Sequence, residues 1–202
     1  STFDGEEEQT IETDKDTVEI PLNPKARLLG TAFTVNAPAG DNLLFHKALD
    51  MAQPGDVIVL ANKGSLSRAL CGEIMSNYAK SRGIAGIIID GCVRDSYTLS
   101  QMDFPVYAKG ITPNGPYKNG PGEMNFPVSF AGIVINPGDI VVGDSDGLLA
   151  IRPDEHTAEL AEIARNYHAG EEKQLEGILT RGEWPRPWVD ETLKKVGFEF
   201  VD

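Results

Sequence analysis

An arginine and an aspartate stand side by side at Arg94 and Asp95, shortly after an apolar run at residues 84–89. The run is too short and too rich in β-branched residues for a helix, so it predicts a buried strand that ends in a glycine turn. Ligands of open α/β sheets bind just beyond the carboxyl ends of such strands. There an arginine can hold a carboxylate with two hydrogen bonds, and an aspartate can bind a hard divalent cation. The pair indicates a metal-assisted enzyme for a small organic acid, and a surface ion pair is the alternative.

A second group of candidate residues lies upstream, at Gly72 and Glu73. A polar loop precedes them and a helical pattern follows, so Gly72 lies at a helix N-terminus. The N–H groups and positive dipole end of such a terminus attract anions, and glycine lets a ligand approach the backbone. The alternative is that Glu73 has no role in a site and is an acidic residue of the first helical turn, where the helix dipole favours a negative charge. The functional interpretation requires the loops of Glu73 and Asp95 to meet, as loops after neighbouring parallel strands do.

The elements that must position these residues alternate between strand and helix early in the chain and are strand-rich in the middle. This order predicts an α/β domain with a mixed sheet and a C-terminal helical arm. A long loop is predicted at residues 110–126, which is uncommon unless it is functional or packed against a neighbour. Predicted strands cover residues 28–35, 57–60, 84–89, 104–107, 128–135, 140–142 and 148–151; predicted helices cover residues 71–81, 97–102, 154–180 and 189–195; and residues 62–68 are predicted to be polar loop.

One further helix is predicted after the turn at residues 39–42, where Asp41 or Asn42 can cap it. Its apolar stripe is expected to consist of Leu43, Leu44, Ala48 and Met51.

Three parts of the chain differ in character. Residues 1–25 form an acidic N-terminal arm, residues 26–153 the catalytic core, and residues 154–202 the C-terminal helical arm. Ordered structure is expected to start near Ala26. The C-terminal arm is long and only narrowly apolar, and Trp184 and Trp188 stand in a proline-fixed kink of the type that anchors interfaces. We therefore expect this arm to pack on a neighbouring subunit.

The composition excludes several functions. The net charge of −13 argues against a nucleic-acid partner, because phosphate binding needs a basic face. No apolar stretch approaches the roughly 18 residues of a membrane span, and no signal peptide is visible, so we expect no membrane partner and a cytoplasmic location. Cys71 and Cys92 fit neither a disulfide framework nor a zinc cluster and are expected to be reduced, half-buried thiols.

An ordered set of short motifs connects these candidate residues to a known family. The motifs are GTAFTV at 30–35, GDN at 40–42, PGDV at 54–57, GE at 72–73, GIAG at 83–86, DGCVRD at 90–95, FPV at 104–106 and PGD at 137–139. Over roughly residues 26–152 the chain resembles the 4-hydroxy-4-methyl-2-oxoglutarate aldolase / RraA-like family. Members often carry the name demethylmenaquinone methyltransferase, but this chain has no glycine-rich nucleotide loop after a first strand.

The resemblance implies an RraA-like α/β/β sandwich that assembles as a homotrimer or a dimer of trimers. It implies a class II aldolase, which cleaves 4-hydroxy-4-methyl-2-oxoglutarate into two pyruvates and in many members decarboxylates oxaloacetate. Asp95 would bind Mg²⁺ or Mn²⁺, with Glu73 holding the metal through water, and Arg94 would bind the substrate carboxylate and keto oxygen. The amides that would cradle the carboxylate are those of Gly72, Glu73, Ile74 and Met75.

The resemblance also implies that a C-terminal glutamate of an adjacent subunit assists catalysis. Glu172 is the candidate by its position before Gly182, and Glu171 and Glu176 compete with it. The small keto-acid substrate is the expected partner. Both family reactions pass through a pyruvate enolate, whose charge a divalent cation and an arginine stabilise.

Two other functions compete with this one. RraA-like regulators share the fold and inhibit an RNA-degrading endonuclease by direct contact, and an acidic protein would suit a basic RNA-binding surface. The third function is a sugar-acid or other keto-acid lyase, which would use the same enolate site with a different aldehyde partner. The sequence does not separate the first lyase from the third, because the enolate half is common to both.

Overall fold

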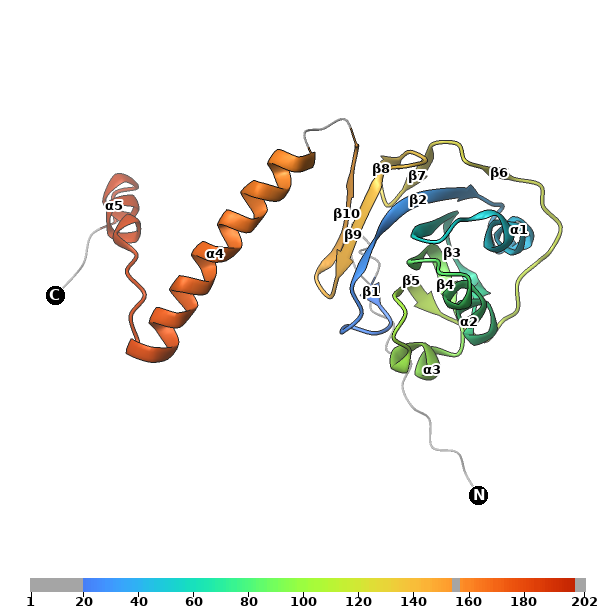
Figure 1. Ribbon diagram of the computed structural model, residues 1–202, viewed down its shortest axis with the longest axis horizontal. Coiled ribbons are helices and arrows are strands. Elements are labelled where there is room, and N and C mark those ends of the chain that lie inside the picture. Colours follow the sequence, from blue (N-terminus) through green and yellow to red (C-terminus); the bar gives the residue numbers. More distant parts are fainter. Residues whose placement is uncertain (1–19, 154–156, 199–202) are drawn as a thin grey trace, which may run out of the picture. The chain divides into compact units, whose positions relative to one another are not determined.

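The computed structural model describes residues 20–153 and 157–198, which divide into a core unit that ends at Glu155 and an arm unit that starts at His156 (Figure 1). The core is built on one eight-stranded sheet in the order β1-β5-β4-β3-β2-β9-β10, with β6 paired to β2. Strands β2, β3, β4 and β5 run parallel, and β1, β6, β9 and β10 join antiparallel, so the predicted mixed sheet is confirmed. The bounds are β1 Ile20–Pro21, β2 Leu28–Asn36, β3 Asp56–Cys71, β4 Gly86–Val93, β5 Val106–Ile111, β6 Glu123–Met124, β9 Ile140–Asp144 and β10 Gly147–Ile151.

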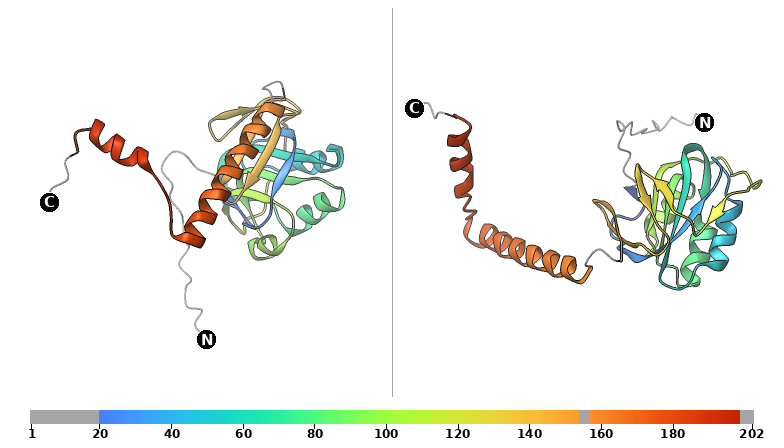
Figure 2. Two further views of the ribbon diagram at one scale, coloured as in Figure 1. Left: turned by 60° about the vertical axis from the view of Figure 1, so that its left-hand side comes forward. Right: turned by 90° about the horizontal axis from the view of Figure 1, so that it is seen from above.

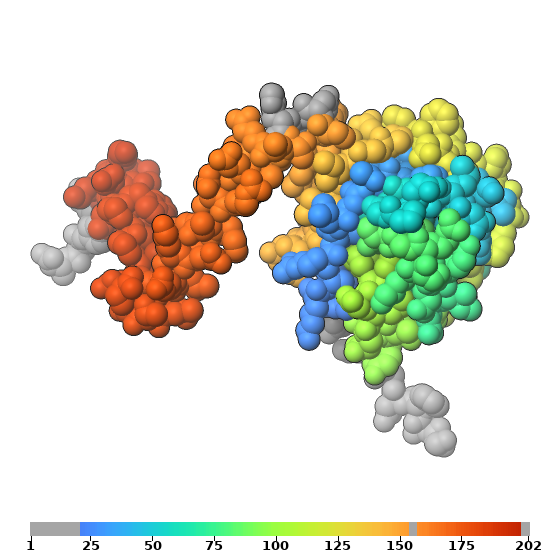
Figure 3. Space-filling model, viewed as in Figure 1, coloured from blue at the N-terminus to red at the C-terminus, as the bar shows by residue number. Residues whose placement is uncertain are grey.

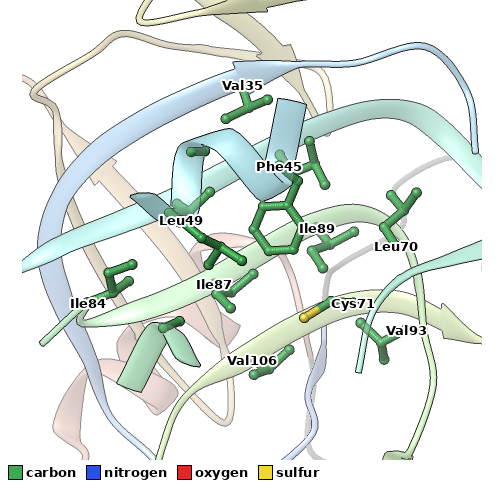
Figure 4. Close-up of a cluster of buried hydrophobic side chains, with 14 of the residues drawn as sticks. Val35, Phe45, Leu49, Leu70, Cys71, Ile84, Ile87, Ile89, Val93 and Val106 are labelled. Carbon is green, nitrogen blue, oxygen red and sulfur yellow. The ribbon is translucent and has the colours of Figure 1, made fainter. Parts of the chain in front are cut away.

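Three helices of the core follow the parallel strands: α1 (Leu43–Met51), α2 (Glu73–Ser81) and α3 (Ser96–Gln101). Phe45 and Leu49 of α1 are fully buried against Ile87 and Ile89 of β4, together with Leu70 of β3, as Figure 4 shows. Figure 3 shows α1 and α2, in cyan and green, forming the surface on this side of the core. This apolar layer fixes the start of α2 beside the ends of β3 and β4.

A β-hairpin covers part of the opposite face of the sheet. Its strands β7 (Val128–Phe130) and β8 (Ile133–Ile135) pair antiparallel, and Val128, Phe130 and Ile135 pack on the second core cluster with Val57, Val59 and Tyr107. A helix layer, the sheet and this hairpin make up the α/β/β sandwich that the family resemblance implied.

Two strands extend further than the sequence predicted. Residues 62–68 belong to β3 rather than to a loop, and β4 continues through Asp90 and Gly91, where a turn was predicted. The pairing of β3 with β4 shifts register between Leu60 and Cys71, so this part is irregular strand. Asn62 is buried and its side chain bonds the backbone of Pro38 and Gly40, which is why a polar residue is tolerated there.

Three smaller predictions about the core were wrong. Structure is present before Ala26, because β1 at Ile20–Pro21 pairs with β5. Residues 128–135 form the two strands of the hairpin rather than one strand. In α1, Leu43 and Met51 are exposed, since the sheet contacts the side of the helix that carries Phe45, Ala48 and Leu49.

The arm unit consists of α4 (Thr157–Arg181) and α5 (Pro187–Lys195), drawn in orange and red in Figure 2. The predicted start of α4, at residue 154, lies outside the described residues. Trp184 donates a hydrogen bond to Gln174 of α4, and the guanidinium of Arg186 stacks 4.2 Å from the Trp184 ring centroid. None of the helices in the described parts of the chain is long and apolar enough to cross a lipid bilayer.

Candidate active site

The two predicted loops meet at the carboxyl ends of neighbouring parallel strands. Cys71 at the end of β3 pairs with Val93 at the end of β4, and the Arg94 amide donates to the Cys71 carbonyl at 2.9 Å. Gly72 and α2 follow β3, and Arg94 and Asp95 follow β4. The structure therefore brings Gly72, Glu73, Arg94 and Asp95 into one site, as the argument from parallel strands required.

Asp95 holds this arrangement together. Its carboxylate oxygen Oδ2 accepts the backbone N–H of Glu73 at 2.9 Å and so caps the N-terminus of α2 from a different loop. The residue has φ 59° and ψ 36°, a left-handed conformation that aspartate tolerates better than most residues and that often marks a functional position. Its other oxygen, Oδ1, has no protein partner within the described part of the chain and is left for a ligand.

Gly72 is needed for the close approach of the two loops. A Cβ on Gly72 would lie 2.5 Å from Asp95 Oδ2 and 2.9 Å from Arg94 Cγ. Any side chain here would displace the two residues that carry the proposed chemistry. The backbone of Gly72 is extended, with φ −159°, so the requirement for glycine is one of space and not of conformation.

The remaining predicted groups surround the same place. The first turn of α2 leaves N–H groups without helical acceptors, and Ile74 and Met75 line the cavity in front of them. The Arg94 side chain is half-exposed, and its Nε lies 3.9 Å from Asp95 Oδ2, which is too long for a hydrogen bond. Its guanidinium is therefore available to a substrate. Glu73 is exposed at the rim.

The structure adds three residues that the sequence did not identify as part of the site: Asn42, His46 and Lys118. The Lys118 Nζ donates to Asn42 Oδ1 at 3.0 Å and lies 3.2 Å from His46 Nε2. Asn42 in turn donates to the Leu70 carbonyl at the end of β3. All three line the same cavity of about 180 Å³ as Arg94 and Asp95, which is below the roughly 300–1,000 Å³ of drug-sized sites and suits a small acid.

Asp41 fixes the loop that carries Lys118. Its buried carboxylate accepts the backbone N–H groups of Leu43, Asn119 and Gly120. Burial alone would raise the Asp41 pKa, but these three N–H groups and the nearby Lys118 charge together lower it below 3.8. The carboxylate is thus stable as an anion, and it holds residues 117–120 against the start of α1.

Two further cavities frame the site. One of about 350 Å³ lies beside it and is lined by Arg94, Asp95 and Ile111 with Thr112 and Pro113, so Arg94 stands between two cavities. The other, of about 540 Å³, contains Asp90 and Lys109, whose side chains form an ion pair at 2.5 Å. The charges of that pair already neutralise one another, which makes it the weaker candidate for catalysis.

The cysteines do not take part as nucleophiles. Both are free and buried. Burial raises the pKa of the Cys71 thiol to about 11 and also raises that of Cys92, so neither is a thiolate near neutral pH. The sequence predicted half-buried thiols, and the structure instead buries both almost completely.

The oxygen donors at this site suit a hard divalent cation. Asp95 Oδ1 and the Glu73 carboxylate are hard ligands, and Mg²⁺ commonly takes one or two carboxylates and keeps several waters. Within the described residues no three His, Cys, Asp or Glu side chains form a metal-binding cluster. The residues present therefore fit a largely hydrated ion, and the metal remains a proposal.

Glu172 belongs to the arm unit, on α4, where it lies 3.5 Å from His168 Nε2. Glu171 and Glu176 lie on the same helix and are also exposed. The core and the arm are separate units, so the predicted contribution of Glu172 to the site stays a prediction.

The fold is an α/β/β sandwich, and the candidate residues Gly72, Glu73, Arg94 and Asp95 lie together at the ends of two parallel strands. A family model described as RraA-like (Aldolase/RraA) matches residues 6–150, and the chain belongs to this family. A Halalkalibacterium halodurans protein provisionally named 4-hydroxy-4-methyl-2-oxoglutarate aldolase is 39% identical over 158 residues, which cover 78% of this chain and 75% of that protein.

Solved structures agree with this assignment. The RNA-processing inhibitor RraA of Thermus thermophilus has a TM-score of 0.64 at 31% identity, over 70% of this chain and 87% of that one. A Geobacillus kaustophilus structure named as an S-adenosylmethionine:2-dimethylmenaquinone methyltransferase has a TM-score of 0.65 at 34% identity, over 69% and 86%. The family thus carries the mixture of names that the resemblance led us to expect.

Proposed function

We propose that this chain is a divalent-metal-dependent lyase that forms a pyruvate enolate, by cleavage of 4-hydroxy-4-methyl-2-oxoglutarate, by decarboxylation of oxaloacetate, or by both. The observation that carries the proposal is the hydrogen bond from the Glu73 amide to Asp95, because it joins an anion-binding helix terminus to a cation-binding carboxylate. The aldolase name of a 39% identical relative supports it.

The chain's own residues can carry the steps. The amides of Ile74 and Met75 bind the C1 carboxylate of the keto acid, aided by the helix dipole. Arg94 donates hydrogen bonds to the keto oxygen. Asp95, and Glu73 through water, would hold a Mg²⁺ or Mn²⁺ ion, which would supply Lewis-acid polarisation of that oxygen. The C3–C4 electron pair then moves into an enolate, whose negative charge Arg94 stabilises.

Proton transfers complete the balance. When the C3–C4 bond of 4-hydroxy-4-methyl-2-oxoglutarate breaks, the C4 hydroxyl loses its proton and C4 becomes the carbonyl of the second pyruvate. When the C3–C4 bond of oxaloacetate breaks, C4 leaves as carbon dioxide and no hydroxyl proton is involved. The exposed carboxylate of Glu73 is the acceptor within the core, and Glu172 of an adjacent subunit is the second candidate. The enolate is then protonated at C3 to give pyruvate, by the proton that the carboxylate accepted in the aldol cleavage and by solvent water in the decarboxylation.

Lys118 supports a substrate with two carboxylates. Its ammonium lies in the same cavity as Arg94, and Asn42 and His46 fix its position. We propose that Lys118 binds the distal carboxylate of 4-hydroxy-4-methyl-2-oxoglutarate or oxaloacetate. A lyase for keto acids with an uncharged aldehyde half would not need this second cation, and this separates it from the first function.

A coupled pyruvate-release assay tests the proposal. The full chain is supplied with each of the two dicarboxylic substrates and with a 4-hydroxy-2-keto acid that lacks the distal carboxylate, each with Mg²⁺, with Mn²⁺ and after chelation. We expect metal-dependent release from the dicarboxylates and weak release from the third compound. Equal release from all three would refute the role of Lys118, and no release from any would refute the lyase.

Assembly is part of the proposal. We propose a homotrimer or a dimer of trimers, with Glu172 completing the site of a neighbour. Glu172→Gln should then lower turnover, while Glu171→Gln and Glu176→Gln on the same helix serve as matched controls. Equal effects of all three substitutions would argue against a specific role for Glu172.

The protein-binding alternative rests on where the acidic residues lie. Residues 1–19 and 154–202 carry the excess of Asp and Glu, whereas acidic and basic residues balance in residues 20–153. Acidic extensions suit a basic RNA-binding surface, and one solved relative is titled an RNA-processing inhibitor. Inhibition of an RNA-degrading endonuclease by the Arg94→Lys variant, as strong as by the wild type, would support this second function.

A further inference from the structure

Arg68, an arginine of β3, contacts the segment that carries Lys118. It is half-buried and lies shortly before Gly72 in the chain. Its two terminal nitrogens donate to the Gly115 carbonyl at 3.1 Å and to the Tyr117 hydroxyl at 2.9 Å. The guanidinium carbon also lies 4.5 Å from the centroid of the Tyr117 ring. One side chain thus holds two alternate residues of a segment that is distant in the sequence.

The residues next to these contacts face the cavity. Pro116 and Lys118 line it, whereas Gly115 and Tyr117 contact Arg68. This alternation is that of an extended chain, in which successive side chains point in opposite directions. The direction of the Lys118 side chain is therefore coupled to that of Tyr117, its neighbour in the chain.

The Tyr117 backbone is fixed as well. Its N–H donates to the Gly40 carbonyl at 2.8 Å, and its carbonyl accepts the Asn42 N–H at 3.0 Å. Gly40 has φ 74°, and a Cβ there would lie 2.9 Å from Arg68 Cγ and 3.5 Å from the Tyr117 ring. Arg68 and the ring thus occupy the space that a side chain at this glycine would need.

The strand around Arg68 is bonded to the start of the same segment. The Ala69 N–H donates to the Asn114 carbonyl at 2.8 Å, and the Asn114 side chain donates to the Ser67 carbonyl at 3.4 Å. Because β3 leads into Gly72, the segment of Lys118 and the N-terminus of α2 share one support.

We propose that Arg68 is a positioning residue, which directs Lys118 toward the distal carboxylate of the substrate and so gives the site its preference for dicarboxylic keto acids. The inference rests on the proposed function. Arg68 acts through Tyr117 and does not touch the substrate. The contact needs a planar group that stacks on a ring and donates in two directions, and a lysine does not supply one.

Substrate preference gives the first test. Its measure is the ratio of kcat/KM for the more reactive dicarboxylic substrate to kcat/KM for a 4-hydroxy-2-keto acid without the distal carboxylate. Arg68→Met should lower this ratio about tenfold, mainly through a higher KM for the dicarboxylate, because both hydrogen bonds and the ring contact are lost. Arg68→Lys should restore little of it. An equal loss with both substrates would show a merely structural role and overturn the proposal.

Lys118→Met shows whether the effect passes through the ammonium. In a chain that already carries this substitution, Arg68→Met should change the ratio no further. A second fall by the same factor would show that Arg68 acts independently of Lys118, and the proposal would be wrong.

Amide hydrogen exchange of the full chain, without substrate or metal, tests the contact itself. Arg68→Met should speed exchange in residues 115–120 at least about fivefold and leave β4 unchanged. Arg27→Met, which removes an arginine from the ion pair with Asp144, is the matched control and should change neither. Pyruvate release by the wild type with unchanged exchange in Arg68→Met would refute this inference alone. Faster exchange without pyruvate release from any keto acid would instead refute the lyase.

Discussion

Two aspartates of one segment, Asp90 and Asp95, have opposite environments. Asp90 lies inside β4, its side chain is 7% exposed, and Lys109 and the Gly64 amide satisfy it at 2.5 and 2.8 Å. Asp95 follows the strand, is 41% exposed and uses one oxygen for the Glu73 amide. The carboxylate of Asp90 has a structural role, because the buried ammonium of Lys109 neutralises it. The carboxylate of Asp95 keeps one oxygen open and can therefore bind a ligand.

The comparison predicts its largest effect at Asp95. Asp95→Ala should abolish metal-dependent pyruvate release and leave the fold intact, because the residue lies outside the apolar core. Calorimetry should show loss of Mg²⁺ or Mn²⁺ binding, and circular dichroism an unchanged spectrum. Unchanged metal affinity would remove Asp95 from the site and make its contact with α2 purely structural.

The opposite result is expected at the buried pair. Lys109→Met leaves the Asp90 carboxylate without its cation and should reduce the free energy of unfolding by about 3–5 kcal/mol. Urea unfolding measures this loss. The turnover of the molecules that remain folded should match the wild type. A fall in turnover at full stability would instead place Asp90 and Lys109 in the chemistry.

Arg94→Lys tests the site around Asp95, where the Arg94 guanidinium is proposed to bind the substrate. Lysine cannot reproduce the planar two-point contact of a guanidinium, so the loss in transition-state stabilisation should be on the order of 3 kcal/mol, about a hundredfold in turnover. Steady-state kinetics with oxaloacetate checks it, with Arg165→Lys at an exposed position of α4 as control. Wild-type turnover of the lysine variant would contradict the role of Arg94.

Gly72→Ala should have a smaller effect, because it displaces the site without removing a group. The new Cβ meets Asp95 Oδ2 and Arg94 Cγ, both of which belong to side chains that can move. We expect roughly tenfold lower turnover, consistent with the sensitivity of catalysis to small misplacements. Gly115→Ala, in a loop position with open space around it, is the control. Equal turnover of the two variants would show that the close approach at Gly72 is not required.

The sequence predicted the parts of the site that depend on local pattern. Apolar runs located the strands, and neighbouring parallel strands placed Glu73 beside Asp95. Lys118 escaped detection because its partner Asn42 lies 76 positions away, and only the buried Asp41 brings the loop of Lys118 to α1. The sequence also failed to predict that β3 continues past Leu60. There the buried polar side chain of Asn62 is satisfied by hydrogen bonds with residues far away in the chain. Neither contact leaves a periodic signal in the chain.

The smallest effect is expected from pH at the rim of the site. Burial first, and the Lys118 charge second, lower the pKa of His46 below 6.5, although Asp50 opposes them. The folded protein therefore binds this proton less readily than the unfolded chain, so stability falls as pH drops below 6.5 and levels off below the folded pKa.

Urea unfolding at about pH 7.5 and about pH 5.5 measures this dependence, within the range where histidine titrates. His46→Gln should lose less stability between the two pH values than the wild type, since glutamine keeps a polar group near Lys118 but cannot take up the proton. His168→Gln, on the exposed arm, is the control for removing one histidine. If His46→Gln and the wild type lose the same stability, His46 does not oppose the Lys118 charge, and the ammonium must be positioned by Asn42 and the Asp41-bound loop alone.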